Sequence, residues 1–192
     1  MIYPVAVYGH PVLRKIAKDI EPDHEGLNEI VENMWETMYE SDGIGLAAPQ
    51  VNKSIRLIVI DASPLEEDFP ELKGFKKVII NPKIVESNEE DDIIDEGCLS
   101  LPTIREEVRR PTQITIKYFD VDFNPITETY YDFAARVVQH EYDHLEGILF
   151  VDHISPLKKR LLKGKLNKIS KGDVNVEYKI LTAPMLNRGK KR

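Results

Sequence analysis

Apolar residues recur at intervals of three and four along one stretch of the chain, which predicts an amphipathic helix from about Asp23 onward. Its stripe consists of Leu27, Ile30, Val31, Met34, Trp35 and Met38. Start and stop signals predict three further helices. They are a short one within residues 10–20, one capped by Asp132 that runs through His144 to about Gly147, and one over residues 155–170.

Runs rich in β-branched and aromatic residues predict the strands. The runs cover residues 55–61, 76–86, 113–123 and 126–132, and a shorter strand-like run covers residues 147–152. A turn at Asn124-Pro125 separates two of these runs, which predicts an antiparallel hairpin. The segment SDGIGLAAPQ contains two glycines and a proline, and it is predicted to be a loop that another backbone or a ligand approaches closely.

No internal repeat or low-complexity linker interrupts this order of elements. We therefore expect an α+β fold with a single domain, in which antiparallel β-sheets pack around a central helix carrying His140 and His144, followed by a C-terminal helix. This domain is expected to occupy residues 1–165. Residues 166–192 are then expected to be a basic C-terminal extension, partly disordered.

Composition narrows the class of protein. The chain has 192 residues, of which 31% are charged. It lacks the run of about 18 apolar residues that a membrane span requires. No signal sequence is visible at its start, and the single cysteine, Cys98, excludes an internal disulfide. We expect a cytoplasmic protein with no membrane association.

Charge is distributed unevenly. The net charge is −7, but residues 158–192 carry +10 and the first 157 residues carry −17. The acidic body argues against specific binding to DNA. The basic end is suited to an anionic partner such as RNA, although a solvated helix face is the more common reason for such a run of charge.

The stretch QHEYDHLEG contains the candidate chemistry. On a helix His140 and His144 lie about 40° apart and Glu141 lies about 100° from His140, so all three share one side. Two imidazoles and a third protein ligand hold zinc-type metals and leave a fourth position for water, whose proton the neighbouring glutamate accepts. Surface histidines are the alternative, but the apolar residues between 133 and 145 indicate a largely buried helix.

The third ligand has to come from elsewhere in the chain. Downstream, Glu146 follows His144 too closely and points away, and His153 lacks the spacing of longer zinc motifs. Upstream, DEGCLSLP places Cys98 after a glycine that lets the backbone approach a metal, and a thiolate is a strong ligand. A lone cysteine is more often buried packing, but beside a histidine pair we favour a ligand.

Three segments resemble, in the same order, the three motifs of the peptide deformylase family: GIGLAAPQ (43–50), EGCLS (96–100) and QHEYDHLEG (139–147). GHPVLRKIA near the start is similar to the opening helix of that family. The resemblance extends from about residue 3 to residue 165. It implies a metal-dependent hydrolase that removes the N-formyl group from the N-terminal formylmethionine of newly synthesised polypeptides and releases formate.

The resemblance also implies roles for individual residues. The metal ligands are expected to be Cys98, His140 and His144. The general base is expected to be Glu141, and the oxyanion hole is expected to consist of Gln50 and the backbone N–H of Leu99. Without its GIGLAAP context, Gln50 would be interpreted as a loop-capping amide.

Substrate contacts follow from the same resemblance. The substrate backbone is expected to lie along Gly43, Ile44 and Gly45 as an added strand, and the methionine side chain against Phe133 and Val137. We expect Glu96 and Arg105 to pair behind the cysteine, although an exposed charge is the default interpretation of Arg105. Arg136 departs from the family pattern, because this position is usually aliphatic, and its charge would alter the mouth of the pocket.

The implied cofactor is Fe²⁺, which Zn²⁺, Ni²⁺ or Co²⁺ is able to replace; the Cys-His₂ set by itself suits zinc. The implied partners are nascent N-formylmethionyl polypeptides, and the basic end of the chain is suited to the ribosome near its exit tunnel.

Two alternatives remain open. One is a metallopeptidase of the HExxH type that cuts internal peptide bonds, which needs neither EGCLS nor the glutamine segment. The other is a binding module with a structural metal site. A structural site requires a fourth protein ligand, and the sequence offers no convincing candidate.

Overall fold

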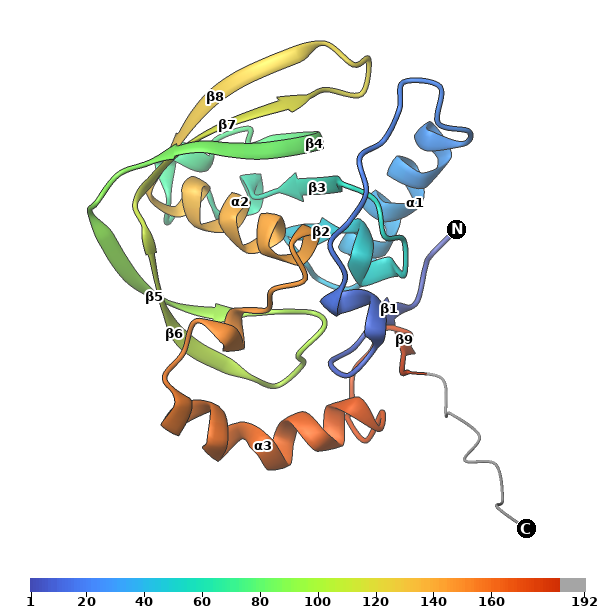
Figure 1. Cartoon of the computed structure of the whole chain (residues 1–192), viewed down its shortest axis with the longest axis vertical. Coiled ribbons are helices and arrows are strands. Elements are labelled where there is room, and N and C mark those ends of the chain that lie inside the picture. The colour runs from blue at the N-terminus through green and yellow to red at the C-terminus, as the bar shows by residue number, and fades with distance from the viewer. Residues whose placement is uncertain (184–192) are drawn as a thin grey trace.

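A five-stranded antiparallel sheet curves around helix α2 (Asp132–Leu145) in the computed structural model, which describes residues 1–183 (Figure 1). In the order β2-β3-β4-β7-β8, its strands are Gly45–Ala47, Leu57–Asp61, Lys76–Ser87, Gln113–Phe119 and Pro125–Tyr131. Two smaller sheets are the antiparallel hairpin β5-β6 (Asp91–Gly97 and Arg105–Pro111) and the parallel pair β1-β9 (Val5–Ala6 and Ile180–Leu181). The other helices are α1 (Leu27–Glu40) and α3 (Pro156–Ser170). The expected α+β fold with a central helix is confirmed.

Strand β3 lies between two hydrophobic clusters, because successive side chains of a strand point to opposite faces. Ile58 and Ile60 face the cluster that contains α2, whereas Leu57 and Val59 face the cluster that contains α1. Both faces are therefore covered, which explains why the strand reads as one continuous apolar run.

Helix α2 is held by this packing. Ala135, Val138 and Leu145 are fully buried against the sheet, and burial of a side chain the size of valine or leucine stabilises by about 1.5–3 kcal/mol. Figure 1 places α2 between the large sheet and the β5-β6 hairpin. The histidines that it carries thus stand on a fixed element.

Several local predictions need correction. The strand-like run at residues 147–152 contains the 3₁₀ helix Phe150–Asp152, in which the Asp152 carboxylate accepts a hydrogen bond from the Leu149 N–H at 2.9 Å. The predicted short helix within residues 10–20 is reduced to the 3₁₀ turn Pro11–Arg14. Helix α2 begins at Asp132, so its N-cap is Tyr131.

Two other segments are more ordered than their sequences suggested. The glycine-containing segment 41–50 holds strand β2 and the start of the 3₁₀ helix Ala48–Val51. The β5-β6 hairpin was not predicted, because strand REEVRRP is rich in charged residues, exposes Arg105, Glu107 and Arg109, and buries only Val108 and Arg110. Further 3₁₀ helices are Ser63–Leu65 and Pro70–Leu72.

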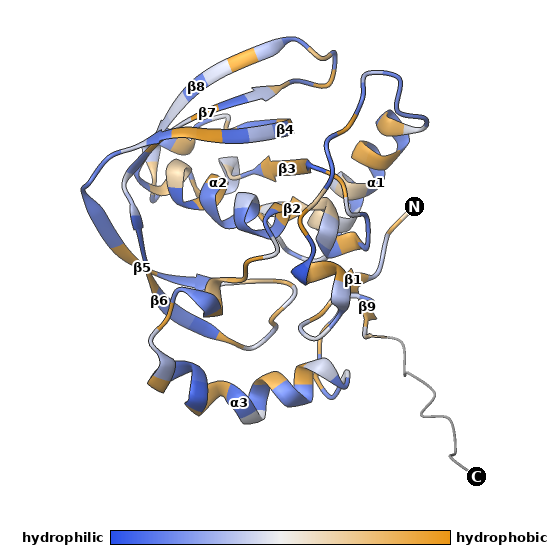
Figure 2. Cartoon of the chain, in the orientation of Figure 1, coloured by the Kyte–Doolittle hydropathy of each residue, from blue (hydrophilic) through white to orange (hydrophobic). Residues whose placement is uncertain are grey.

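The C-terminal part of the described chain follows α3 back to the N-terminal segment, where β9 pairs with β1. Ser155 caps α3 by accepting a hydrogen bond from the Lys158 N–H at 3.3 Å, and α3 shows alternating polar and apolar bands (Figure 2). The boundary expected after residue 165 falls inside this helix. The rest of the expected extension reaches β9, and its residues 184–192 lie outside the described residues. Within residues 1–183 no helix has the length and apolar character needed to cross a membrane.

Candidate metal centre and active site

Helix α2 presents His140, Glu141 and His144 toward the end of β5. The two imidazole ring centroids are 5.2 Å apart, as expected for positions one helical turn apart. Glu141 and His144 are buried. Because one packed helix carries all three side chains, their relative directions are set by the helix and not by a loop.

Cys98 follows β5, and its sulfur comes next to both histidines. The Sγ atom lies 3.4 Å from His144 Nε2, and the ligand atoms of Cys98, His140 and His144 all lie within 4.8 Å of one another. Burial acts to raise the pKa of the Cys98 thiol, but the two histidines lower it to about 5. A thiol with this pKa is a thiolate at neutral pH, which is the form that binds metal ions.

The donor set fits a transition metal. One thiolate with two imidazoles suits zinc, iron, cobalt or nickel. Beside the cluster, the buried Glu141 Oε2 has no hydrogen-bond partner in the protein, and a buried carboxylate needs one. Among residues 1–183, no fourth His, Cys, Asp or Glu joins the three ligands. A metal held here would therefore keep a position open, which is the arrangement of a catalytic rather than a structural site.

Glu146 and His153 lie elsewhere. Glu146 pairs with Arg56 at 2.7 Å, and His153 contacts Asp143 at 2.7 Å. Neither residue belongs to the ligand cluster.

Glu141 is packed against strand β2. A Cβ atom added at Gly45 would lie only 2.5 Å from Glu141 Oε1, so the glycine is what allows the carboxylate to stand against the strand. Burial is the main cause that raises the pKa of Glu141 above its usual value. A carboxylate with a raised pKa is better able to accept and return a proton near neutral pH.

Gln50 is buried, and its two amide atoms have different partners. The side-chain oxygen accepts a hydrogen bond from the Ala47 N–H at 2.8 Å. The Nε2 group donates to Ser100 Oγ at 3.3 Å and lies 3.6 Å from Cys98 Sγ. Gln50 therefore caps its own loop through the side-chain oxygen, while its N–H₂ group is directed at Cys98 and Ser100.

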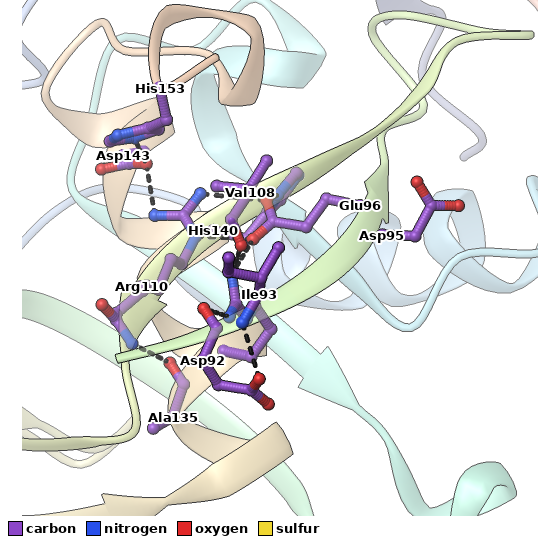
Figure 3. A network of polar contacts seen from close by, with 12 residues as sticks. Asp92, Ile93, Asp95, Glu96, Val108, Arg110, Ala135, His140, Asp143 and His153 are labelled. Carbon is purple, nitrogen blue, oxygen red and sulfur yellow. Dashed lines mark hydrogen bonds and ion pairs between the residues drawn. The ribbon is translucent and has the colours of Figure 1, made fainter. Parts of the chain in front are cut away.

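A network of charged side chains stands behind His140, and Figure 3 shows Glu96 of β5 at its centre. Glu96 Oε2 lies 2.8 Å from His140 Nδ1, which leaves the other ring nitrogen available to a metal. Arg110 donates from Nε and Nη2 to the Glu96 carboxylate at 2.6 and 3.0 Å, and from Nη1 to Asp143 at 2.7 Å. Burial acts to raise the pKa of Glu96, but His140 and Arg110 hold it well below its usual range.

This network corrects two expectations. Arg105 pairs with exposed Asp95 at 3.0 Å and not with Glu96, and Asp95 points away from the network in Figure 3. Arg136 is buried, and its guanidinium donates to Glu96 at 2.9 Å and to the carbonyls of Val108 and Asp92 at 2.8 Å each. Arg136 does line the cavity, as expected, but its charge is paired with Glu96 and is not free.

A cavity of about 680 Å³ opens beside the cluster. Phe133 and Val137 line it one helical turn apart, and the Phe133 ring stacks on Phe69 with centroids 4.1 Å apart. The cavity is also lined by Gly43, Ile44, Gly45, Gln50, Cys98, Leu99, His140 and Glu141. Strand β2 is the edge strand of its sheet, so an extended peptide can add beside it. The structure thus brings the expected substrate and catalytic residues around one cavity.

Sequence reasoning missed several residues of this site, among them Arg110, Val176 and Tyr178. Arg110 stands in an unpredicted strand. Val176 and Tyr178 line the cavity from the C-terminal segment. The alternation of polar and apolar residues in DVNVEYKI was the available signal for that segment.

Comparison with known proteins gives a consistent result. A sequence model described as polypeptide deformylase matches residues 2–160. The peptide deformylase of Christiangramia forsetii is 52% identical over 187 residues, which cover 94% of this chain and 95% of the relative. A solved peptide deformylase from Legionella pneumophila has 38% identity and a TM-score of 0.79, and the match covers 90% of this chain and 98% of that chain. A Met-Ala-Ser-bound class I type b enzyme from Acinetobacter baumannii has 37% identity and a TM-score of 0.74, and the match covers 80% and 99%.

Proposed function

The chain belongs to the polypeptide deformylase family and removes the N-formyl group from nascent polypeptides, and we propose that it does so with a metal ion held by Cys98, His140 and His144. The observation that carries this proposal is the convergence of three ligand atoms within 4.8 Å of one another. When bound, the metal ion supplies Lewis-acid chemistry, polarising the formyl group and making water a stronger nucleophile.

Glu141 is proposed to move the proton. It accepts the proton of the water that attacks the formyl carbon and returns it to the amine as the C–N bond breaks, so that formate and a free N-terminus are released. Its burial and raised pKa support both transfers. Glu96 keeps the His140 ring oriented through its contact with Nδ1.

Two donors are proposed for the oxygen that gains negative charge. They are the Nε2 group of Gln50, which lies 3.6 Å from Cys98 Sγ, and the backbone N–H of Leu99, and both residues line the cavity. Because Gln50 cannot ionise and its oxygen is already bonded to Ala47, its N–H₂ group remains a fixed donor. Loss of one such donor typically reduces the rate on the order of 10²–10³-fold.

The substrate is proposed to bind as an extended chain beside Gly43, Ile44 and Gly45, with its methionine side chain against Phe133 and Val137. An apolar cavity lined by aromatic and aliphatic side chains suits a flexible thioether. The Met-Ala-Ser bound to the Acinetobacter baumannii relative supports a peptide with N-terminal methionine as the occupant.

We propose Fe²⁺ as the ion in the cell, with Zn²⁺, Ni²⁺ or Co²⁺ able to replace it. Anaerobic purification followed by metal analysis tests this assignment. Stoichiometric zinc in a fully active preparation would contradict it.

We also propose that the enzyme works in the cytoplasm and meets nascent chains at the ribosome near the exit tunnel. Lys163, Lys165 and Lys168 are exposed along α3, which supports contact with RNA. Substituting Lys163 and Lys165 by glutamate is expected to reduce co-sedimentation with ribosomes at low salt without changing formate release from a dipeptide. Equal co-sedimentation would refute this part of the proposal.

Formate release tests the reaction itself. The protein is expected to release formate from formyl-Met-Ala. It is expected not to cleave a peptide whose two ends are blocked and whose only cleavable bonds are internal. Turnover of only the blocked peptide would reject the proposal in favour of a peptidase.

Two substitutions test the assigned roles. Glu141→Ala is expected to retain the metal and lose about 10²–10⁴-fold in kcat, because it removes the proton acceptor alone. Cys98→Ser is expected to lose affinity for soft metal ions, because it removes the thiolate. Metal analysis and kinetics of both variants separate the roles, and a metal-free Glu141→Ala or a Cys98→Ser that binds metal as tightly as wild type would contradict them.

A further inference from the structure

The segment of residues 173–181 forms a wall of the cavity. Its even-numbered side chains, Val174, Val176, Tyr178 and Ile180, are half-buried, whereas those of the odd-numbered residues 173–179 are exposed. This alternation is that of a strand with one covered face. Hydrogen bonds from the Val5 N–H to the Lys179 carbonyl at 2.8 Å and from the Val7 N–H to the Leu181 carbonyl at 3.0 Å tie the segment to β1. The wall is thus anchored independently of α2.

Tyr178 joins this segment to the cysteine loop, residues 98–101. Its hydroxyl donates a hydrogen bond to the Leu99 carbonyl at 2.8 Å, across 79 positions of sequence. The two neighbouring carbonyls are bonded from other places: Cys98 O by the Leu101 N–H at 2.9 Å and Ser100 O by the Tyr8 N–H at 2.8 Å. Tyr178 therefore supplies the partner of the middle carbonyl in the loop.

The orientation of Leu99 matters because its N–H and its carbonyl belong to adjacent planar peptide groups, related only by the φ and ψ of Leu99. Holding the carbonyl restricts both angles and so restricts where the N–H points. We propose that Tyr178 is a positioning residue that keeps the Leu99 N–H directed at the developing oxyanion, an inference that rests on the proposed function. Tyr178 lines the same cavity as Cys98 and Glu141, close enough for this role to affect the reaction.

The test is Tyr178→Phe in the full metal-loaded enzyme, because it removes only the hydroxyl. With formyl-Met-Ala as substrate, kcat per bound metal is expected to fall on the order of tenfold, less than the loss of an oxyanion donor outright. KM is expected to stay within about twofold, since an interaction that acts only in the transition state changes kcat alone. Amide exchange at Leu99 is expected to become faster, which measures the loop directly and independently of turnover.

Two controls match this substitution. Tyr131→Phe removes the hydroxyl of an exposed tyrosine, and Lys179→Ala alters an exposed side chain of the same segment. Both are expected to behave as wild type. An unchanged kcat and exchange rate in Tyr178→Phe, or a loss of activity that disappears when expressed per bound metal, would overturn the inference. Absence of formate release from the wild-type enzyme would instead overturn the proposed function.

Discussion

Replacing Gly45 by alanine is expected to displace the carboxylate of Glu141. The added Cβ would lie 2.5 Å from Glu141 Oε1 and 2.9 Å from both Cδ and Cγ. Ordinary contacts begin at 3.4 Å, so the carboxylate or strand β2 has to move by about 0.9 Å. Glu141 is only 5% exposed, so it has little free space into which to move.

The expected loss follows from this displacement. A misplacement of about 1 Å in a reacting group can reduce the rate on the order of 10²-fold. The overpacking is also expected to reduce the free energy of unfolding by about 1–3 kcal/mol. Formate release from formyl-Met-Ala measures kcat and KM, and thermal unfolding measures stability. The decrease should appear mainly in kcat, because the added Cβ contacts the Glu141 carboxylate, whereas the substrate is proposed to bind the backbone of Gly45.

Gly164→Ala is the matched control. Gly164 lies on the exposed face of α3, and nothing stands within 4 Å of an added Cβ. Alanine there is expected to stabilise the helix by up to about 1 kcal/mol and to leave kcat unchanged. A Gly45→Ala enzyme with wild-type kcat would refute the argument that the glycine makes room for the base.

Two further predictions concern stability. Arg136→Met removes the buried ion pair with Glu96 and the two hydrogen bonds to the carbonyls of Val108 and Asp92, and it is expected to destabilise by about 3 kcal/mol, or roughly 6–12 °C in Tm. Arg105→Met, which removes an exposed pair, should change stability by about 1 kcal/mol or less, and equal Tm decreases would contradict this contrast. Burial acts to raise the pKa of Asp152, but Arg14 and Lys159 lower it from 3.8 to about 2. Because the folded-state pKa is the lower one, this stabilisation is present above pH 3.8 and is lost as the pH falls toward 2. Because Asp152 is partly exposed and its ion pairs are screened by solvent, Asp152→Asn is expected to destabilise by about 1 kcal/mol at pH 7 and progressively less below pH 3.8. Acid-dependent unfolding measures this difference, and a difference independent of pH would contradict the prediction.

Local sequence signals, namely the periodicity of apolar residues and the start and stop residues, were sufficient to predict the long helices. The apolar stripe of α1 is a local pattern, and the helix spacing that aligns His140 with His144 is equally local. The same reasoning fails for the β5-β6 hairpin, whose paired charges resemble a solvated loop. Only the folded chain buries Val108 against Phe150 and α3 and brings Arg110 to Glu96 and Asp143. A strand that buries only two side chains has too weak a pattern to be recognised alone.

The sequence also does not indicate which arginine pairs with Glu96. Arg105, Arg109 and Arg110 all lie within a few residues of one another in REEVRRP. Only the register of β5 on β6 and the approach of α2 decide that Arg110 faces inward while Arg105 meets Asp95 at the surface. A shift of one residue would exchange these faces.

The sequence by itself determined the α+β class, the helix that carries the two histidines, and the residue types that suit a transition metal. These features depend on local spacing and on the chemistry of single side chains. Tertiary structure alone decided which arginines pair with Glu96. It decided that the Glu141 carboxylate packs against Gly45, where a larger residue would displace it. It also decided that a tyrosine near the C-terminus supports the carbonyl of Leu99. Such contacts join residues far apart in the chain, and their partners are selected by packing, which no local pattern encodes.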